Sequence, residues 1–493
     1  MHRTAKWLLI ACLLMLLFVY TASGVVDLDL WHELALAREA LQIGHVPWED
    51  HFAYTPTLDV VVHHEWGAGL IAYLATAALG PAGLLLLKFS LVSGLALVCW
   101  CNARRRGASV IATGLVAALA IWLRDYSFGT VRAQMYSYLL AALLLWGFDR
   151  DRKGDRRWLV GLFVLFPLWV NLHGGCLVGA GLLGGHWLEQ WLRRQPHRHL
   201  LIAGLLLIPL AALNPWGWHY HAYLARAMTM PRPCIAEWDP VWIEWPHLIR
   251  FVVSVGLGWL VLREGRWRQM PGILLLVATG LAGLKSNRFL TFYAIVCACY
   301  LPAQLSRIEL GKVLRRGWWK YQRALCGVFA LCSLLLLGKA LTEEPWRVRV
   351  PGHREKDAAF HLTYPVGAVN YLTEQKFRGN VFVPYNFGSY VMWKLGPEVQ
   401  VSFDSRYEVA YPTWRLEEDE AFFEAREGWE ETLAKYRTDI VLSLVNMEVA
   451  KKLADRPGWQ TVYRDSQFAM FAREELSLPI KISDAVPPEG QYP

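Results

Sequence analysis

Residues 82–101 read AGLLLLKFSLVSGLALVCWC and lead into the basic triplet Arg104-Arg105-Arg106. A run of this length, coiled as a helix, crosses the roughly 30 Å hydrocarbon core of a bilayer. Similar apolar runs, about 14 to 21 residues long, recur from the N-terminus to about residue 341 and then stop. The 493-residue chain is therefore predicted to be a polytopic α-helical membrane protein. This pattern excludes a single soluble domain, a disordered chain and a fibrous repeat.

The connections between these runs are alternately rich and poor in Lys and Arg. The predicted spans are 7–26, 82–101, 107–123, 133–148, 158–171, 176–192, 200–213, 249–263, 271–287, 289–305 and 324–341. Arg3 and Lys6 precede the first span, and a basic cluster follows every second span. The positive-inside rule then predicts about eleven spans, with the N-terminus in the cytoplasm and the C-terminus outside. For the first run, a signal peptide cleaved at Ala22-Ser23-Gly24 is the alternative.

The segment between the first two spans is acidic. Residues 27–66 contain eight acidic residues and one basic residue, Arg38. The apolar run 66–79 is about 14 residues long, which is short for a span, so an interfacial or re-entrant helix is predicted there. Residues 27–81 are therefore expected to form a long outer loop that carries interfacial helices. The net charge of +8 is then mostly cytoplasmic anchoring charge and not a sign of nucleic-acid binding.

The composition becomes that of a soluble protein after residue 341, and residues 342–493 hold 18 basic and 24 acidic residues. Strand-like stretches at 381–383, 399–403, 439–444 and 461–463 alternate with helix-like stretches at 366–375, 416–435 and 447–453. This alternation predicts a small α/β domain. Residues 478–493 are rich in Pro and are expected to be frayed. Two domains follow: a transmembrane domain over 1–341 and a soluble extracytoplasmic α/β domain over 342–493.

Unusual polar residues gather at the span ends that face outward in this topology. They are Asp27, Asp29, His63, His64, Glu65, Arg124, Asp125, Arg132, Asn171, His173, Asn214, His219, His221, Glu237, Asp239, Lys285, Asn287 and Arg288. The predicted cytoplasmic connections carry plain clusters of Lys and Arg instead. Charged groups near the bilayer are costly and tend to mark function, so we interpret the outer set as one outward-facing cavity. For each residue taken singly, a headgroup anchor or a helix cap is the alternative.

The segment directly after the first span reads DLDLWHE over residues 27–33. Leu30, Leu34, Ala37 and Leu41 share one face at helical spacing. An amphipathic helix on the outer surface is predicted, with Asp29 as its N-cap. A cap does not need a second acid two residues earlier, so Asp27 and Asp29 are candidates for chemistry as well.

Three features of the sequence resemble the GT-C superfamily of glycosyltransferases. They are an acidic residue just outside the first span, an interfacial helix ending in Ala37-Arg38 before Gly44 and Pro47, and a long outer first loop. Members include protein mannosyltransferases and aminoarabinose transferases. The resemblance, which covers most of the chain, implies a polytopic fold that moves a sugar from a polyprenyl-phosphate donor. It also implies that Asp29 is the catalytic carboxylate.

Further motifs extend this resemblance. Lys285-Ser286-Asn287-Arg288-Phe289 is similar to the family's motif that engages the donor phosphate. Five other short motifs resemble a less characterised bacterial branch of the family. They are residues 171–175 (NLHGG), 214–217 (NPWG), 237–238 (EW), 387–390 (FGSY) and 403–406 (FDSR). Many members carry a second acid after the catalytic one, where this chain has Leu30, so Asp27 would stand in.

Lipid-linked glycosyl transfer needs a base for the acceptor hydroxyl and cations for the departing phosphate. The candidate base is Asp29, with Asp27 alternative or assisting. The candidate phosphate ligands are Arg288, Lys285 and Arg132, because guanidinium and ammonium groups bind phosphate oxygens. The candidate sugar or acceptor contacts are His63, His64, Glu65, Asn171, His173, Asn214 and Glu237. Metal use stays open, since His63-His64-Glu65 could hold a divalent cation with Asp29 but lacks an i,i+4 His pair.

These features predict a glycosyltransferase of the inner membrane that transfers a hexosyl or pentosyl group from a polyprenyl-phosphate sugar to a lipid, glycan or protein acceptor. No Walker or dinucleotide-binding Gly pattern occurs in the sequence, and no nucleic-acid partner is expected. A lipid or sugar transporter or flippase is one alternative, although it would place polar groups at mid-membrane. A non-catalytic membrane scaffold that displays the tail is the other.

Overall fold

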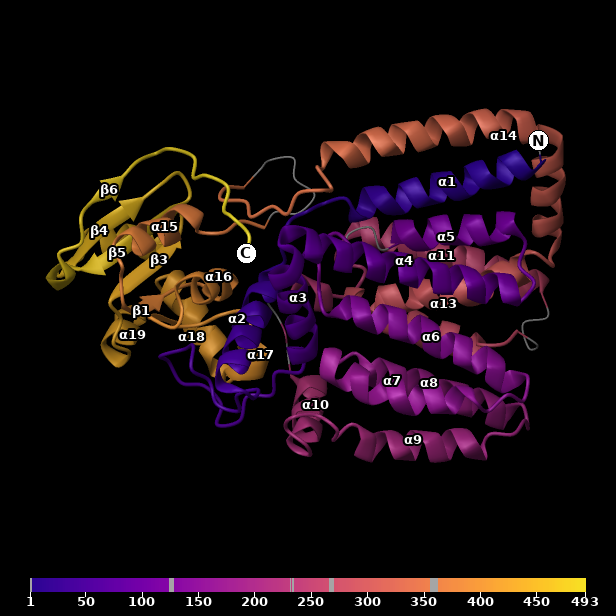
Figure 1. The fold of residues 1–493 in the computed structure, drawn as a ribbon, viewed down its shortest axis with the longest axis horizontal. Coiled ribbons are helices and arrows are strands. Elements are labelled where there is room, and N and C mark those ends of the chain that lie inside the picture. The colour runs from indigo at the N-terminus through magenta and orange to yellow at the C-terminus, as the bar shows by residue number, and fades with distance from the viewer. Residues whose placement is uncertain (1, 124–127, 231, 233–234, 266–269, 355–361) are drawn as a thin grey trace. The chain divides into compact units, whose positions relative to one another are not determined.

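The computed structural model describes residues 2–123, 128–230, 232, 235–265, 270–354 and 362–493. The chain divides into two compact units (Figure 1). One unit contains Met1–Gly24, Leu85–His221 and Thr229–Trp346, and the other contains Val25–Leu84, Ala222–Met228 and Arg347–Pro493. We call the first the helical unit and the second the outer-loop unit, because residues 27–81 group with the tail.

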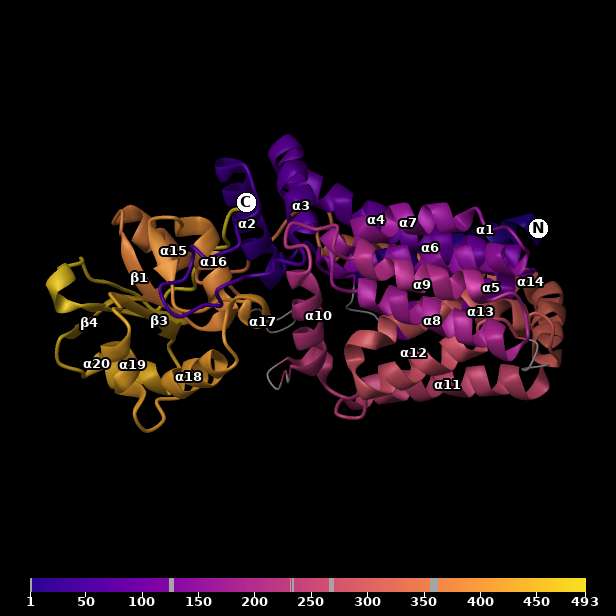
Figure 2. The same cartoon turned by 90° about the horizontal axis from the view of Figure 1, so that it is seen from below.

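A helix lies at each span predicted from the sequence. These helices are α1 (His2–Thr21), α4 (Pro81–Arg105), α5 (Val110–Leu123), α6 (Gln134–Arg152), α7 (Trp158–Leu172), α8 (Cys176–Leu192), α9 (Arg198–Leu210), α11 (Trp245–Glu264), α12 (Ile273–Lys285), α13 (Leu290–Leu305) and α14 (Glu309–Thr342). In Figures 1 and 2 they run side by side within the helical unit. Among the described residues, five segments are long and apolar enough to cross a membrane. The protein is thus a polytopic helical membrane protein.

Burial differs sharply between two of these helices. In α13, 14 of the 16 residues are buried, including polar Thr291. In α14, only Gly311, Trp318 and Ala340 are buried, although its C-terminal half is strongly apolar. An exposed apolar helix of this kind fits lipid and not water. Tyr321 breaks α14 with non-helical dihedral angles, so the basic segment before it bends away from the apolar span that follows (Figure 1).

The outer-loop unit contains a six-stranded sheet with the order β2-β1-β3-β5-β4-β6. Its elements are α15 (Val366–Glu374), β1 (Gly379–Phe382), α16 (Tyr385–Leu395), β2 (Val399–Val401), α17 (Tyr407–Ala410), α18 (Trp414–Phe423), α19 (Trp429–Lys435), β3 (Ile440–Leu444), α20 (Glu448–Ala454), β4 (Trp459–Arg464), β5 (Phe468–Arg473) and β6 (Lys481–Ile482). β1 pairs in parallel with β2 and β3, while β5 pairs antiparallel with β3 and β4. The register sets Val381 beside Ile440 and Val441 beside Phe471.

Three features of this tail differ from expectation. The helix predicted over 416–435 is two helices, because Ala425 and Gly428 adopt positive φ between α18 and α19. Strand β5 and helix α16 lie in stretches where no element was predicted. The expectation that 478–493 frays is wrong, because Gly490 N–H donates to Val350 O at 2.8 Å and the Tyr492 hydroxyl lies 2.8 Å from Thr76 Oγ1.

The outer loop joins this sheet directly. Ala53 forms a parallel bridge with Val401 of β2, and the Val401 N–H donates to Phe52 O at 3.0 Å. Its two helices are α2 (Leu28–Ile43) and α3 (Trp66–Leu79). The backbone groups at the edge of β2 are thereby satisfied by the loop, as an exposed sheet edge requires.

Arg38, in the Ala-Arg pair of α2, fixes this helix to the tail. Its Nη1 donates to Trp393 O at 3.1 Å and its Nη2 to Gly396 O at 3.3 Å, at the end of α16. The guanidinium also lies 4.5 Å from the centre of the Trp393 ring. A cation at the C-terminal carbonyls of a helix satisfies groups that lack intrahelical partners. This contact is a structural reason for the arginine of the Ala-Arg pair.

Candidate functional site

The first turn of α2 holds the two acids proposed for catalysis, and its N-cap is Asp27 and not Asp29. Asp27, with φ −78° and ψ 153°, is the N-cap, and its Oδ1 accepts a hydrogen bond from Asp29 N at 3.1 Å. The expectation that Asp29 caps the helix is therefore wrong. Asp29 lies inside the first turn and is half-buried, whereas Asp27 is buried. Asp29 thus does not cap the helix, and the positive end of the helix dipole stabilises its carboxylate.

Helix α2 is more deeply buried than a helix on the surface would be. Leu30, Leu34 and Ala37 are buried as predicted, but Leu41 is 52% exposed and Glu33 is buried. Gly69 of α3 explains the close packing beside Glu33, because a Cβ at Gly69 would lie 2.8 Å from Glu33 Cβ and Glu33 O. The bare backbone of Gly69 lets α3 approach α2 here. Glu65, one turn earlier in the chain, is carried toward Glu33 by this packing.

His32 links α2 to the tail. Its Nδ1 lies 2.9 Å from Ser405 Oγ, which lies 2.8 Å from Ser389 Oγ in α16. Burial lowers the pKa of His32 to about 4, although Asp404 acts in the opposite direction. The imidazole is therefore neutral at neutral pH, with Nδ1 engaged by a hydroxyl group.

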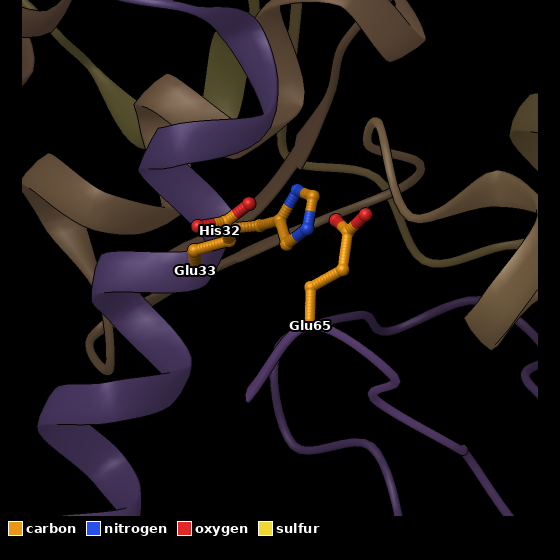
Figure 3. Close-up of side chains that lie close together, drawn as sticks. All are labelled: His32, Glu33 and Glu65. Atoms are coloured by element: carbon orange, nitrogen blue, oxygen red, sulfur yellow. The ribbon is translucent and has the colours of Figure 1, made fainter. Parts of the chain in front are cut away.

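The His63-His64-Glu65 motif precedes α3 and is also packed inside this unit. His64 Nε2 lies 3.3 Å from Glu65 Oε1, and its Nδ1 lies 2.8 Å from the Tyr223 hydroxyl of α10 (His219–Thr229). Burial, followed by the charge of Arg406, lowers the pKa of His63 well below its ordinary value. The two histidines are thus buried in the outer-loop unit, and the structure groups Glu65 with His32 and Glu33 (Figure 3).

The same unit contains a buried ion cluster. Arg406 Nη2 is 2.7 Å from Asp404 Oδ2, and Arg406 Nη1 contacts Asp50 of the outer loop. Burial alone would raise the pKa of Asp404, but the Arg406 charge and hydrogen bonds outweigh it and lower the pKa to about 2. The FDSR motif therefore has two separate tasks: Asp404 and Arg406 tie the loop to the sheet, and Ser405 contacts His32.

A second polar cluster lies in the helical unit, and we call Arg132, Glu237, Trp238 and Arg288 the arginine cluster. Arg132 contacts Glu237, and Arg288 Nη1 lies 3.8 Å from Glu237 Oε2. The Arg288 guanidinium lies 5.1 Å from the centre of the Trp238 ring, within cation–π range. Two guanidinium groups thus contact one carboxylate, and the side chains of Arg132, Glu237 and Arg288 are partly exposed.

Backbone hydrogen bonds bring these distant segments together. Asn287 N–H donates to Asp239 O at 3.0 Å, and the Ser286 hydroxyl donates to Glu237 O at 3.1 Å. The turn that begins α13 is thereby fixed to the short helix η1 (Ala236–Trp238). Asn287, in the 3₁₀ turn η3 (Asn287–Phe289), is buried in this junction, which gives its place in the motif a structural reason.

An apolar cavity of about 480 Å³ lies in the same unit. It is lined by residues of α1, α4, α5 and α13, including Thr291, Ala294, Ile295 and Ala298 of α13, and by Phe128. Arg288 comes three residues before Thr291, and Arg132 comes four residues after Phe128. The walls of the cavity and the two arginines therefore belong to the same chain segments.

Three other predicted residues are placed elsewhere. Lys285 is exposed at the end of α12 and forms no ion pair with the residues that the structure describes. Asn171 Nδ2 donates to Pro167 O and Leu213 O, both at 2.8 Å, and Asn214 Oδ1 accepts from Trp216 N at 2.8 Å. These bonds to backbone groups indicate that both asparagines shape turns between helices.

His173 follows α7 and is buried. Its Nδ1 accepts a hydrogen bond from Gly175 N at 2.8 Å and lies 2.8 Å from Ser137 Oγ, which itself accepts from Trp169 Nε1. The glycine at 175 is explained by close packing and not by a positive φ, because a Cβ there would lie 2.4 Å from Ser137 Oγ. Arg124 and Asp125, also in the predicted outer set, lie outside the described residues.

The helix ends that were predicted to face the cytoplasm carry more than clusters of Lys and Arg. Asp151, in the last turn of α6, is buried and accepts from Trp158 Nε1, and it lies 3.1 Å from His186 Nε2 and 2.8 Å from His199 Nε2. The expectation of plain Lys and Arg clusters is wrong at this point. Sequence alone did not reveal the network because its members come from α6, α7, α8 and α9.

Comparison with known proteins was made at the level of sequence and of structure. The sequence matches no protein-family model and no curated protein. The structure matches that of ArnT from Cupriavidus metallidurans in the apo state, with a TM-score of 0.54 and 14% sequence identity, over 94% of this chain and 97% of the other. It also matches the same ArnT bound to undecaprenyl phosphate, with a TM-score of 0.55, 14% identity and the same coverage.

The chain has the fold of ArnT, an aminoarabinose transferase of the GT-C superfamily. The likeness to the GT-C fold predicted from the outer-loop motifs is thereby confirmed at the level of architecture. The match extends over almost the whole of both chains.

Within this ArnT fold, several site residues were not assigned from the sequence. His32 and Glu33 lie three and four residues after Asp29, which puts them on the same face of α2. That spacing is a signal that could have identified them. Tyr223 and Ser405 carry no such signal, because only the tertiary structure sets them beside His64 and His32.

Proposed function

We propose that the chain is a glycosyltransferase that moves a sugar from a polyprenyl-phosphate-linked donor to an acceptor at the outer face of the inner membrane. The observation that carries this proposal is that the arginine cluster and the apolar cavity belong to the same chain segments. Arg288 lies in η3, two residues before α13 begins, and α13 lines the cavity from Thr291 onward. A ligand with a phosphate head and a long hydrocarbon chain has this combination of properties.

The arginine cluster is proposed to bind the donor phosphate. Arg288 and Arg132 both hold Glu237, so the donor phosphate would share or displace this carboxylate. Guanidinium groups bind phosphate oxygens with two parallel hydrogen bonds, which neutralises the charge that develops as the sugar leaves. Lys285 is proposed as an outlying cation, since it is exposed one turn before Arg288.

The reaction itself asks little of the protein beyond a base and these cations. The acceptor oxygen forms a bond to the anomeric carbon, the bond from that carbon to the phosphate oxygen breaks, and the acceptor proton passes to a carboxylate. Asp29 is proposed as this carboxylate, because it sits at a helix start without serving as the cap. Asp27, buried and hydrogen-bonded to Asp29 N, is proposed to assist by holding that first turn.

The remaining predicted residues complete the proposal. His63, His64, Glu65 and His173 are proposed to shape or contact the sugar and acceptor sites, while Asn171 and Asn214 hold the turns between helices. The topology proposed is eleven spans over residues 1–341, a cytoplasmic N-terminus, and an extracytoplasmic α/β domain over 342–493. ArnT, which shares the fold, has been solved with undecaprenyl phosphate bound, and this supports a polyprenyl phosphate as the lipid.

The test is a comparison of glycans and glycolipids from host cells with and without the gene, followed by transfer from the extracted polyprenyl-phosphate sugars with the purified protein. A transferase converts donor to polyprenyl phosphate and glycosylated acceptor. A flippase would move the lipid between leaflets with its sugar intact, and a scaffold would do neither. Intact donor after prolonged incubation with every extracted acceptor fraction would count against the proposal.

A further inference from the structure

The first part of α14, residues 309–323, is strongly basic, and we call it the basic segment. It reads ELGKVLRRGWWKYQR and contains five basic residues and one acid, Glu309. All five basic side chains are exposed: Lys312, Arg315, Arg316, Lys320 and Arg323. We propose that the basic segment binds the headgroups of anionic phospholipids at the membrane surface. This interaction goes beyond the transfer reaction and does not depend on it.

The basic segment lies across the helical unit and not along it. Tyr321, with φ −110° and ψ 18°, breaks α14 directly before its apolar part. In Figure 1 the part of α14 before this break crosses the ends of the neighbouring helices, whereas the part after it runs beside α1. Since α1 and the apolar part of α14 are long and apolar enough to cross the membrane, a helix across their ends is expected at the membrane surface.

One face of the basic segment is fixed to the helical unit. Gly311 and Trp318, about two turns apart, are buried. A Cβ at Gly311 would overlap Leu305 O, and Trp318 packs with Ala5 and Leu9 of α1. This packing sets the orientation of the segment about its own axis, so the faces that carry the basic residues point away from the helical unit.

The exposed faces have the pattern of a helix at a boundary between lipid and water. Lys312, Arg316 and Lys320 recur at four-residue spacing, which aligns them along one side of the helix. Val313 and Tyr321 are each 54% exposed on the adjoining side. Basic side chains beside exposed apolar side chains are typical of helices that bind anionic membranes.

Acids of the protein do not balance the positive charge of the basic segment. Glu309 contacts Lys312, but the other four basic residues form no ion pair with any acid among the residues that the structure describes. Clusters of about four to eight Lys and Arg next to a span are typical of surfaces that bind anionic lipids, whose phosphates supply the complementary charge. The apolar part of α14 follows directly after the segment, which favours a lipid of the bilayer over a soluble anion.

The test uses full-length protein in phosphatidylcholine nanodiscs that contain a small share of photoactivatable phosphatidylglycerol or, separately, of photoactivatable phosphatidylcholine. After irradiation and digestion with chymotrypsin, mass spectrometry measures the lipid attached to residues 309–323. The wild type is expected to be labelled more strongly by phosphatidylglycerol. The triple variant Arg315→Gln, Arg316→Gln and Lys320→Gln is expected to lower this labelling at least about 10-fold. The double variant Arg315→Lys and Arg316→Lys should keep it, because the attraction depends on charge.

The matched control is the triple variant Arg105→Gln, Lys153→Gln and Arg157→Gln, which removes the same charge from other exposed positions of the helical unit. It should leave the labelling of the basic segment unchanged, and thermal unfolding checks that both triple variants are folded. Excess unlabelled phosphatidylglycerol should suppress the labelling, whereas inorganic phosphate at matched ionic strength should not. Equal labelling by the two lipids, equal losses in the two triple variants, or suppression by inorganic phosphate would overturn the proposal whether or not transfer is observed.

Discussion

The hydroxyl of Ser405 lies 2.9 Å from Nδ1 of His32, although 373 positions separate the two residues in the sequence. His32 belongs to α2, and Ser405 lies between β2 and α17. Residues from the two ends of the chain therefore meet within the outer-loop unit. Ser405 orients the histidine, while Asp404 and Arg406 on either side of it hold the loop in place.

Asp29 and Asp27 can be separated by substitution, because only Asp27 caps α2. Asp29→Asn should leave the free energy of unfolding almost unchanged and lower the rate of transfer at least about 100-fold, as expected for the loss of a general base. Asp27→Ala should cost about 1 kcal/mol through the lost cap, and Asp27→Asn should restore it. Thermal unfolding and transfer rates measure both. Near-full transfer by Asp29→Asn would refute its role as the base.

Arg288 is predicted to determine donor affinity. Arg288→Ala should weaken binding of a polyprenyl phosphate while the protein still folds and inserts. Arg288→Lys should recover little, because a compact ammonium group cannot reproduce the two parallel hydrogen bonds of a guanidinium. Fluorescence competition with a polyprenyl phosphate in nanodiscs would measure the Kd. Arg226→Ala, which removes a hydrogen bond to Glu408 O within the outer-loop unit, is the control and should bind normally.

The proposed topology predicts which positions an impermeant thiol reagent reaches in intact cells. In a background without native cysteines, Cys at Asp59 or Glu427 should be labelled, since both positions are exposed in the outer-loop unit. Cys at Glu309, exposed at the start of α14, should be labelled only after the cells are opened. The reverse pattern would invalidate the assignment of all the outer residues.

Gly69 is predicted to be intolerant of a side chain. Gly69→Ala places a Cβ 2.8 Å from Glu33 Cβ and backbone O, so the contact of α2 with α3 must open. We expect a loss of roughly 1–3 kcal/mol, as for other overpacked positions. Gly204→Ala in α9 is the control, because a Cβ there would meet nothing within 4 Å, and it should be neutral or stabilising. Equal Tm values for the two variants would contradict the packing argument.

The ion cluster around Arg406 predicts a large effect on stability. Arg406→Gln leaves Asp404 and Asp50 buried without their cation, which should cost roughly 3–5 kcal/mol. Arg426→Gln, which removes an exposed pair with Glu424, should cost less than about 1 kcal/mol. Because Arg406 lowers the pKa of Asp404 to about 2, this stabilisation is complete above about pH 4 and is lost as the pH falls toward 2. Acid unfolding of wild type and Arg406→Gln, followed by circular dichroism, measures the difference.

The sequence alone determined where the helices of the helical unit lie, because a membrane span must be apolar along its whole length and satisfy its backbone internally. A helix is found at each predicted span, from α1 to α14. Several strands of the tail were predicted for a similar local reason, the clustering of β-branched residues in short runs. The GT-C motifs in the outer loop also indicated the fold, since each motif is short and contiguous along the chain.

What the tertiary structure alone decided is which polar groups meet. Capping depends on the backbone dihedral angles at Asp27, which a run of two acids does not specify. The meeting of Arg132, Glu237 and Arg288, and that of His32, Glu65 and Ser405, depends on helices packing across hundreds of residues. Apolar periodicity predicted the burial of Leu30, Leu34 and Ala37, but not the exposure of Leu41 or the burial of Glu33. Polar contacts are directional and need donors within about 3 Å, so only the packed structure defines them.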